Sequence, residues 1–184
     1  EFLTFTWNGK QYRHVGAPFG LNFLPNWFHR HLSHLFADLE DVYVYLDDIL
    51  IATICPKEHM RIVKLVLQRL NDANLRLNID KCVFGVRECI FLGFKISEKG
   101  IEIDPGRQKR LIDVGTPKTG KDLQSVLGMF NFVRDHIPSY GKIASPLYQL
   151  TKEKCLDDHP LWLSEGYDAF KTIIEKLSGP TILK

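Results

Sequence analysis

The chain has 184 residues, of which 45% are hydrophobic and 25% charged, and its formal net charge at pH 7 is +2. This composition is typical of a soluble globular protein of one or two domains, and it excludes collagen, coiled coil and extended disorder. The near-neutral charge also argues against a strongly basic nucleic-acid binder, unless the basic residues gather in one part of the chain.

The first half of the sequence predicts a mixture of strands and helices. Residues 42–53 form two runs of β-branched and aromatic residues interrupted by Asp47 and Asp48, a pattern that predicts a hairpin with the acidic pair at its reversal. Residues 56–74 carry apolar residues at helical spacing and predict an amphipathic helix. Its expected apolar face consists of Met60, Val63, Val66, Leu67, Leu70 and Ala73.

After Asp104 the sequence changes to short helices, each preceded by a capping residue. Asp104 precedes a helix that begins at Pro105, and Thr119 precedes one that spans 120–135. We therefore expect an α+β fold with a boundary near residue 100, between a mixed part and a small helical part. The other expected elements are a strand at 89–96, a turn at 98–100, a return strand at 101–103, and helices that begin near Ser145 and Ser164.

The charge is unevenly distributed along the chain, with −3 over residues 1–56, +2 over 57–104, +5 over 105–154 and −2 over 155–184. An acidic first block and a basic third block would suit a protein that holds cations at one place and phosphates at another, although chance fluctuation explains the same counts. The four cysteines match no zinc or disulfide spacing, so we expect reduced thiols in an intracellular protein. No apolar run approaches the ~18 residues of a membrane span, so no membrane partner is expected.

The adjacent carboxylates of Asp47 and Asp48 are the strongest candidate for chemistry. Two acidic residues at a hairpin tip, held by apolar strands on both sides, could present oxygen ligands to Mg²⁺, which proteins usually hold through one or two carboxylates and substrate phosphates. An Asp-Asp pair in a turn is also a common solvated turn, and the residues alone leave both interpretations open.

These residues belong to a longer series of motifs that resembles the reverse transcriptases of gypsy-type long-terminal-repeat retrotransposons. The resemblance covers essentially the whole chain, in order and at family spacing, and Tyr45-Leu46-Asp47-Asp48 matches the family's Tyr-x-Asp-Asp hairpin. The other matching motifs are Pro18-Phe19-Gly20-Leu21, Pro25, Phe28-His29-Arg30, Leu77-Asn78, Lys81-Cys82, Phe84-Gly85, Phe91-Leu92-Gly93, Gly100-Ile101, Asp104-Pro105, Pro117-Lys118-Thr119, Leu127-Gly128, Asn131-Phe132, Ile137-Pro138, Lys142-Ile143-Ala144, Pro146-Leu147, Trp162, Ala169-Phe170-Lys171 and Pro180.

The resemblance implies a role for each group of matching residues. Asp47 and Asp48 would hold two Mg²⁺ ions, with Mn²⁺ as an alternative, and Lys81 would assist the leaving pyrophosphate. The implied nucleotide and template contacts are Pro18, Phe19, Gly20, Leu21 and Tyr45. The implied primer grip is Phe91, Leu92, Gly93 and Phe94. The implied duplex-binding residues are Arg107, Lys109, Arg110, Lys118 and Lys121.

Each of these roles has a structural alternative that the residues leave open. Lys81 could be a solvated lysine, and Gly20 a simple bend after Pro18. The Phe-Leu-Gly run at 91–93 could be an ordinary strand with a bulge, and the basic residues could be the polar sides of amphipathic helices. The sequence also contains three closely spaced histidines, His29, His31 and His34. We interpret them as helix surface, because their spacing fits no strong metal template.

Under this resemblance residues 1–100 are a polymerase palm without its fingers and first catalytic strand, 101–158 a helical thumb, and 159–184 the start of a tether toward a ribonuclease H domain. The family's first catalytic aspartate lies upstream of the segment that matches residues 2–6, so we expect the chain to be inactive alone. Phe23-Leu24 stands where the family has Asn-Ala, which leaves the details of the nucleotide pocket open.

The leading functional hypothesis is therefore a fragment of an RNA-directed DNA polymerase, which transfers nucleotides onto a primer 3′ end. Its expected partners are an RNA/DNA template-primer, dNTPs, the upstream palm and fingers, and a downstream ribonuclease H portion. The alternatives are a retrotransposon-derived, non-catalytic binding or structural module, and a subunit that recovers the missing aspartate from a partner chain. An exposed sheet edge near 42–53 also predicts a homodimer. The expected location is the cytoplasm or a virus-like particle, with the nucleus as an alternative.

Overall fold

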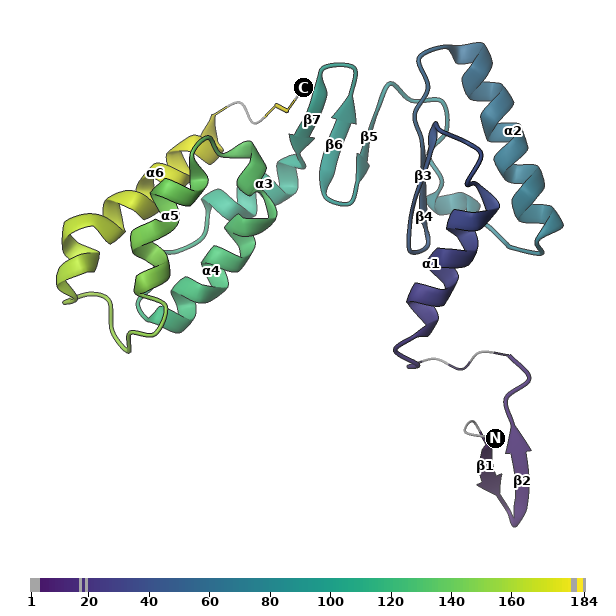
Figure 1. Ribbon diagram of the computed structural model, residues 1–184, viewed down its shortest axis with the longest axis horizontal. Coiled ribbons are helices and arrows are strands. Elements are labelled where there is room, and N and C mark those ends of the chain that lie inside the picture. The colour runs from purple at the N-terminus through teal and green to yellow at the C-terminus, as the bar shows by residue number, and fades with distance from the viewer. Residues whose placement is uncertain (1–3, 17, 19, 180–181, 184) are drawn as a thin grey trace. The chain divides into compact units, whose positions relative to one another are not determined.

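The computed structural model describes residues 4–16, 18, 20–179 and 182–183, and Figure 1 shows its elements. The chain forms two compact units, Glu1–Cys82 and Val83–Lys184, which we describe separately. Each unit combines helices with antiparallel strands, so the expected α+β class is confirmed. No helix of the described residues is long and apolar enough to cross a membrane.

A two-stranded hairpin opens the first unit. Strands β1 (Thr4–Trp7) and β2 (Lys10–Arg13) pair in antiparallel fashion, and every residue of both strands is exposed. Asn8 and Gly9 connect them with φ values of 52° and 74°, the positive values that a type I′ turn requires at both central residues. This hairpin adds to the elements expected from the sequence, although Asn-Gly is a strong hairpin signal.

The core of the first unit is formed by helix α1 (Leu24–Leu35), helix α2 (Pro56–Asp72) and a second hairpin of strands β3 (Val42–Tyr45) and β4 (Asp48–Ile51). The hairpin expected over 42–53 and the helix expected over 56–74 are thus confirmed. The buried residues of this core are Leu32, Phe36, Ile62, Val66 and Leu70, and the strand residues that pack against them are Val42, Val44, Ile49 and Ile51.

The buried stripe of α2 differs from the expected one. Ile62, Val66 and Leu70 are buried, at a spacing of four residues, whereas the side chain of Met60 is 56% exposed and that of Leu67 is 37% exposed. The helix carries more apolar residues than one face can bury, so helical spacing alone does not determine which side faces the core.

An ion pair joins α2 to the chain that follows α1. The Arg69 guanidinium in α2 donates to the Leu35 carbonyl oxygen at 2.8 Å and to both carboxylate oxygens of Asp38 at 2.5 and 2.6 Å. This hydrogen-bonded guanidinium lowers the pKa of the Asp38 carboxyl to about 2. The pair is exposed to solvent, so it fixes the chain after α1 more than it stabilises the fold.

A three-stranded antiparallel sheet begins the second unit, with strands β5 (Glu88–Phe91), β6 (Phe94–Ser97) and β7 (Gly100–Ile103). The single strand expected over 89–96 is wrong, because the chain reverses at Leu92 and Gly93, where φ is 53° and 81°. Two central residues with positive φ make the tight turn that joins β5 to β6. The apolar run continues through this turn, so composition gives no sign of the break.

Helices make up the rest of the second unit. The capping residues expected at two of them are confirmed: Asp104 Oδ2 accepts the Arg107 N–H at 3.0 Å, and Thr119 forms a capping box with Asp122. Within the described part of this unit the α-helices are α3 (Pro105–Ile112), α4 (Gly120–Phe132), α5 (Tyr140–Gln149) and α6 (Tyr167–Ser178).

Three helix boundaries differ from the expected ones. Helix α4 ends at Phe132 and is followed by a 3₁₀ turn, so the helix expected over 120–135 is shorter. Helix α5 begins at Tyr140 and contains Pro146, although proline was expected to mark a helix start. The helix expected after Ser164 is preceded by a π-helical turn that carries the chain into α6.

One hydrophobic core holds the second unit together, and it includes a residue of the sheet. Ile103 of β7 is 1% exposed within this core, and Ile101 forms an isolated antiparallel bridge with Leu183. The sheet therefore belongs to the same compact unit as these helices. Along the sequence, the boundary between the two compact units falls between Cys82 and Val83. The division into palm, thumb and tether stays a prediction. The core residues from the α-helices are Leu111, Leu123, Val126, Leu127, Phe130, Tyr140, Ala144, Leu147, Phe170, Ile173 and Leu177.

The paired-carboxylate hairpin and its surroundings

Asp47 and Asp48 lie at the tip of the hairpin formed by β3 and β4. Tyr45 and Asp48 are directly opposite each other in the ladder, and Leu46 and Asp47 form the two-residue connection between the strands. Val44 and Ile49 direct the other face of the hairpin to the core of the first unit, while both carboxylate residues are exposed. The hairpin thus holds two adjacent acidic side chains in solvent, while its opposite face packs against the core of the first unit.

The backbone of this turn is strained, and one histidine holds it. Leu46 has a φ of 54°, which is unusual for a bulky residue, costs of order 1–3 kcal/mol and persists only where the surroundings enforce it. Its N–H donates to Nδ1 of His29 in α1 at 3.2 Å, which requires that Nδ1 carry no proton. The His29 ring also faces the Tyr45 ring, with centroids 6.4 Å apart. His29 therefore couples helix α1 to the acidic turn.

The acidic turn offers oxygen ligands, but only two carboxylates meet there. Among the described residues, no group of three or more His, Cys, Asp or Glu side chains could hold a metal ion. Two adjacent carboxylates still fit Mg²⁺, which retains several waters and shares its coordination with substrate phosphates. A further protein ligand would have to come from another segment.

Two other residues that were predicted to act near the acidic turn, Lys81 and Gly20, lie in other segments of the first unit. Lys81 is exposed at the end of a 3₁₀ turn (Ile79–Lys81), and no ion pair or hydrogen bond among the described residues joins its side chain to the acidic pair. Gly20 has a φ of +89° in the chain before α1, and a Cβ there would meet no atom within 4 Å. Phe19, like Phe2 and Pro180, lies outside the described residues.

Phe23, which stands where the resembled family has asparagine, is the N-cap residue of α1. It makes no side-chain capping bond, and its side chain is 61% exposed. Asparagine is among the best capping residues, so one physical consequence of this replacement is an uncapped helix start next to Gly20.

The residues expected to grip a primer and follow a duplex lie in the second unit. Leu92 and Gly93 form the β5–β6 turn between Phe91 and Phe94, so this motif is a hairpin tip and not a bulged strand. Arg107 is half-buried in α3, and the four other basic residues are exposed. These four are Lys109, Arg110, Lys118 and Lys121.

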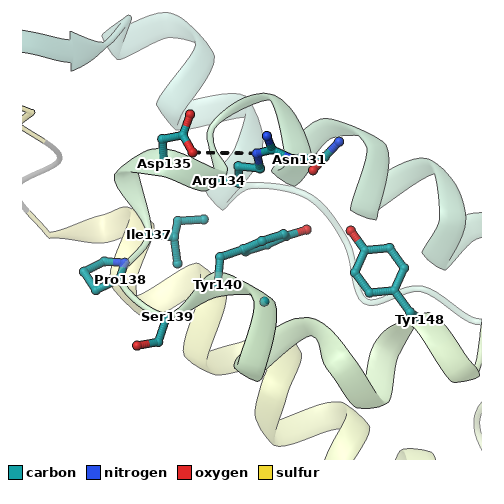
Figure 2. Close-up of a pocket in the computed structure, with 9 residues that line it drawn as sticks. Asn131, Arg134, Asp135, Ile137, Pro138, Ser139, Tyr140 and Tyr148 are labelled. Atoms are coloured by element: carbon teal, nitrogen blue, oxygen red, sulfur yellow. Dashed lines mark ion pairs between the residues drawn. The ribbon is translucent and has the colours of Figure 1, made fainter.

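A separate surface pocket of about 510 Å³ lies at the end of α4 and the start of α5, as Figure 2 shows. The Tyr140 hydroxyl is buried there and has no hydrogen-bond partner among the described residues. Burial raises the pKa of Tyr140, with a smaller contribution from the nearby Tyr148 hydroxyl, which does not meet hydrogen-bond geometry. The residues singled out for metal, primer and duplex contacts do not line this pocket.

The acidic turn, at the tip of a hairpin that packs against α1 and α2, lies within the part of the chain that matches a known family. The family described as reverse transcriptase (RNA-dependent DNA polymerase) matches residues 1–96, and the chain belongs to this family. Its relatives include polyproteins of transposons, so the resemblance to long-terminal-repeat retrotransposon enzymes is confirmed.

Two relatives show how far the similarity extends. The chain is 32% identical over 173 residues to the retrovirus-related Pol polyprotein from transposon 297 of Drosophila melanogaster, covering 92% of this chain and 16% of that polyprotein. It is 32% identical over 180 residues to the Pro-Pol polyprotein of feline foamy virus, covering 98% of this chain and 16% of that protein. The chain thus spans about a sixth of the length of these relatives.

Solved structures agree with this assignment. A foamy viral protease-reverse transcriptase in complex with double-stranded DNA matches the whole chain with a TM-score of 0.85 and 29% identity, over 32% of its own length. A foamy viral protease-reverse transcriptase in complex with an RNA/DNA hybrid matches 98% of the chain with a TM-score of 0.79 and 30% identity, over 25% of its own length.

The contact between His29 and the acidic turn leads to a prediction. In the H29L variant the Leu46 N–H loses its acceptor, at a net cost of about 1 kcal/mol, and the strained φ loses a restraint. A loss of 1.4 kcal/mol in binding free energy corresponds to tenfold weaker binding. If the loss of about 1 kcal/mol is carried into metal binding, we expect Mn²⁺ to bind the acidic turn roughly fivefold more weakly. Line broadening of the Asp47 and Asp48 amide signals in a Mn²⁺ titration measures this.

Asparagine provides the matched control for His29, because its side-chain oxygen can accept the same N–H. The H29N variant should bind Mn²⁺ within about twofold of the unsubstituted chain. Equal affinities in H29L and the unsubstituted chain would show that the histidine does not support the turn.

Proposed function

We propose that this chain contributes the metal-binding hairpin of an RNA-directed DNA polymerase, with Asp47 and Asp48 as ligands of Mg²⁺. The observation that carries the proposal is the acidic turn itself, which is exposed at its tip, anchored on the core face and restrained by His29. When bound, paired Mg²⁺ ions supply activation of the primer hydroxyl and stabilisation of the leaving oxygen in nucleotidyl transfer. The protein's own part is to hold two carboxylates rigidly beside each other.

Nucleic acid is the proposed partner of the second unit, which would act as the thumb. The exposed lysines and arginine of α3 and α4 offer positive charge to phosphates, which a duplex presents regardless of sequence. The related viral enzymes have been solved with double-stranded DNA and with an RNA/DNA hybrid, which supports a duplex as the partner here. The Leu92-Gly93 turn would contact the primer strand, and Lys81 the leaving pyrophosphate.

A third carboxylate would come from another segment of the polyprotein. Among the described residues no third such ligand joins Asp47 and Asp48, and the relatives are about six times as long as the matched stretch. A non-catalytic module is the second candidate function, and the uncapped start of α1 at Phe23, beside the implied nucleotide pocket, favours it.

Primer extension distinguishes these functions. We expect no synthesis on an RNA template by the 184-residue chain with Mg²⁺ or Mn²⁺, and synthesis by a longer polyprotein segment that adds the residues upstream of Glu1. The D48N variant of the longer segment is the control for contaminating polymerase. Synthesis by the 184-residue chain would contradict the need for a third carboxylate. An inactive longer segment that still binds duplex would establish the non-catalytic module.

A further inference from the structure

The Leu92-Gly93 turn is held from outside its own hairpin by the start of α3. The Asp104 N–H donates to the Gly93 carbonyl oxygen at 3.2 Å. The Arg107 guanidinium fills the space above Gly93, where a Cβ would lie 2.6–2.9 Å from three of its atoms. Gly93 is therefore required twice, once for its φ of +81° and once for the close approach of arginine.

The Arg107 guanidinium also lies over an aromatic ring. Its central carbon lies 4.0 Å from the centroid of Phe132, the last residue of α4, in a cation–π contact. The backbone of Arg107 is also fixed, because its N–H caps onto Asp104 Oδ2. The guanidinium thus contacts both the turn and the last residue of α4, and Arg107 is only partly exposed to solvent.

Stacked rings extend this connection along β6. Phe94, the residue after the turn, stacks on Phe132 with centroids 5.0 Å apart and on His136 with centroids 5.3 Å apart, at interplanar angles of 12° and 19°. His136 is 7% exposed, so the stack is anchored in the interior of the unit. The turn, the start of α3 and the end of α4 are in this way joined through side chains.

We propose that Arg107 is a positioning residue that locks the Leu92-Gly93 turn to the end of α4, and that it does not contact duplex phosphates. This inference rests on the proposed function, in which the turn contacts the primer and the α3–α4 region follows the duplex. A rigid connection keeps the primer contact and the duplex contacts at a constant spacing. Arginine suits this role because its flat guanidinium stacks on a ring and a glycine at once, which a lysine ammonium does not.

The test uses the 184-residue chain and two readouts that separate positioning from phosphate binding. Hydrogen exchange of the Asp104 amide reports the bond to the Gly93 carbonyl, and exchange of the Ile173 amide, in the buried interior of α6, is the internal reference. The salt dependence of binding to an RNA/DNA hybrid reports phosphate contacts, since each one contributes about 0.9 to the slope of log K against log salt for B-DNA.

The R107K and R107Q variants should each speed exchange of the Asp104 amide at least tenfold while the Ile173 amide keeps its rate. Hybrid binding by R107Q should keep the salt slope of the unsubstituted chain. The K109Q variant, on the exposed side of the same helix, is the matched control: its slope should fall by about one and its Asp104 exchange should not change.

Three results would overturn the proposal. The first is a salt slope that falls as much in R107Q as in K109Q, because Arg107 would then contact a phosphate. The second is Asp104 exchange that is unchanged in both Arg107 variants. The third is equal acceleration at Ile173, which would mean a loss of overall stability. If the chain binds no hybrid at all, the proposed function fails, and the exchange measurements alone decide whether Arg107 locks the turn.

Discussion

The D48N variant of an active polyprotein segment that contains this chain is expected to lose nucleotidyl transfer by about 10³-fold or more. Asparagine keeps the shape of the side chain but removes its charge, and the transition-state stabilisation that a carboxylate-held metal supplies is worth several kcal/mol. Each 1.36 kcal/mol of that stabilisation corresponds to a factor of ten in rate. Asp48 pairs with Tyr45 in the ladder, so the substitution leaves the backbone of the hairpin in place.

Single-turnover primer extension measures the rate, and a Mn²⁺ titration of the 184-residue chain measures metal binding at the same residue. The D47N variant should lose activity to a similar extent, because both carboxylates are proposed ligands. Asp72, exposed at the end of α2, is the matched control, and D72N should extend primers like the unsubstituted segment. Activity of D48N within tenfold of the unsubstituted segment would remove Asp48 from the metal site.

The parts of this fold that the sequence predicted are those set by local chemistry. The β3–β4 hairpin follows from β-branched residues on both sides of Asp47 and Asp48, and the start of α2 from Pro56. The caps at Asp104 and Thr119 follow from side chains that bond N–H groups three residues further on. Such interactions need no partner far along the chain, so a single sequence is enough to find them.

The parts that the sequence missed depend on distant partners or on backbone conformation. His29 supports the acidic turn through a bond to Leu46, 17 residues away, and its spacing from other histidines carries no sign of this. The reversal at Leu92 and Gly93 is hidden in a continuous apolar run, where only the glycine hints at a positive φ. The resemblance to a known family located these motifs, but it did not reveal which side chains restrain them.

Arg107 illustrates the same limit for charge patterns. Counting basic residues groups it with Lys109 and Lys121, whereas the structure places its guanidinium against Gly93 and over the ring of Phe132. A positive residue in a basic helix can thus serve packing as well as phosphate binding. Telling the two apart needs the contacts of the side chain, which composition and spacing do not contain.

The second large effect is expected in the core of the second unit. Phe130 of α4 is 0% exposed and faces the Phe170 ring of α6, with centroids 6.1 Å apart. The F130A variant should lower the free energy of unfolding of this unit by about 3–5 kcal/mol, because it removes buried aromatic surface and leaves a cavity between two helices. A loss of that size is a large part of the stability of a typical domain.

Denaturant unfolding of the full chain measures the loss in free energy of unfolding. Hydrogen exchange of amides in α4 and α6, measured without denaturant, shows that the loss occurs in this unit. The neighbouring Met129 is the matched control, since it is 41% exposed on the same helix and M129A should change the free energy of unfolding by no more than about 0.5 kcal/mol. The exchange of α2 amides should not change in F130A, because that helix has its own core of Ile62, Val66 and Leu70. Equal losses in F130A and M129A would mean that α4 does not pack through Phe130. Accelerated exchange in α2 would mean instead that the two compact units unfold together, so that a defect in the proposed thumb would also reach the helices that support the acidic turn.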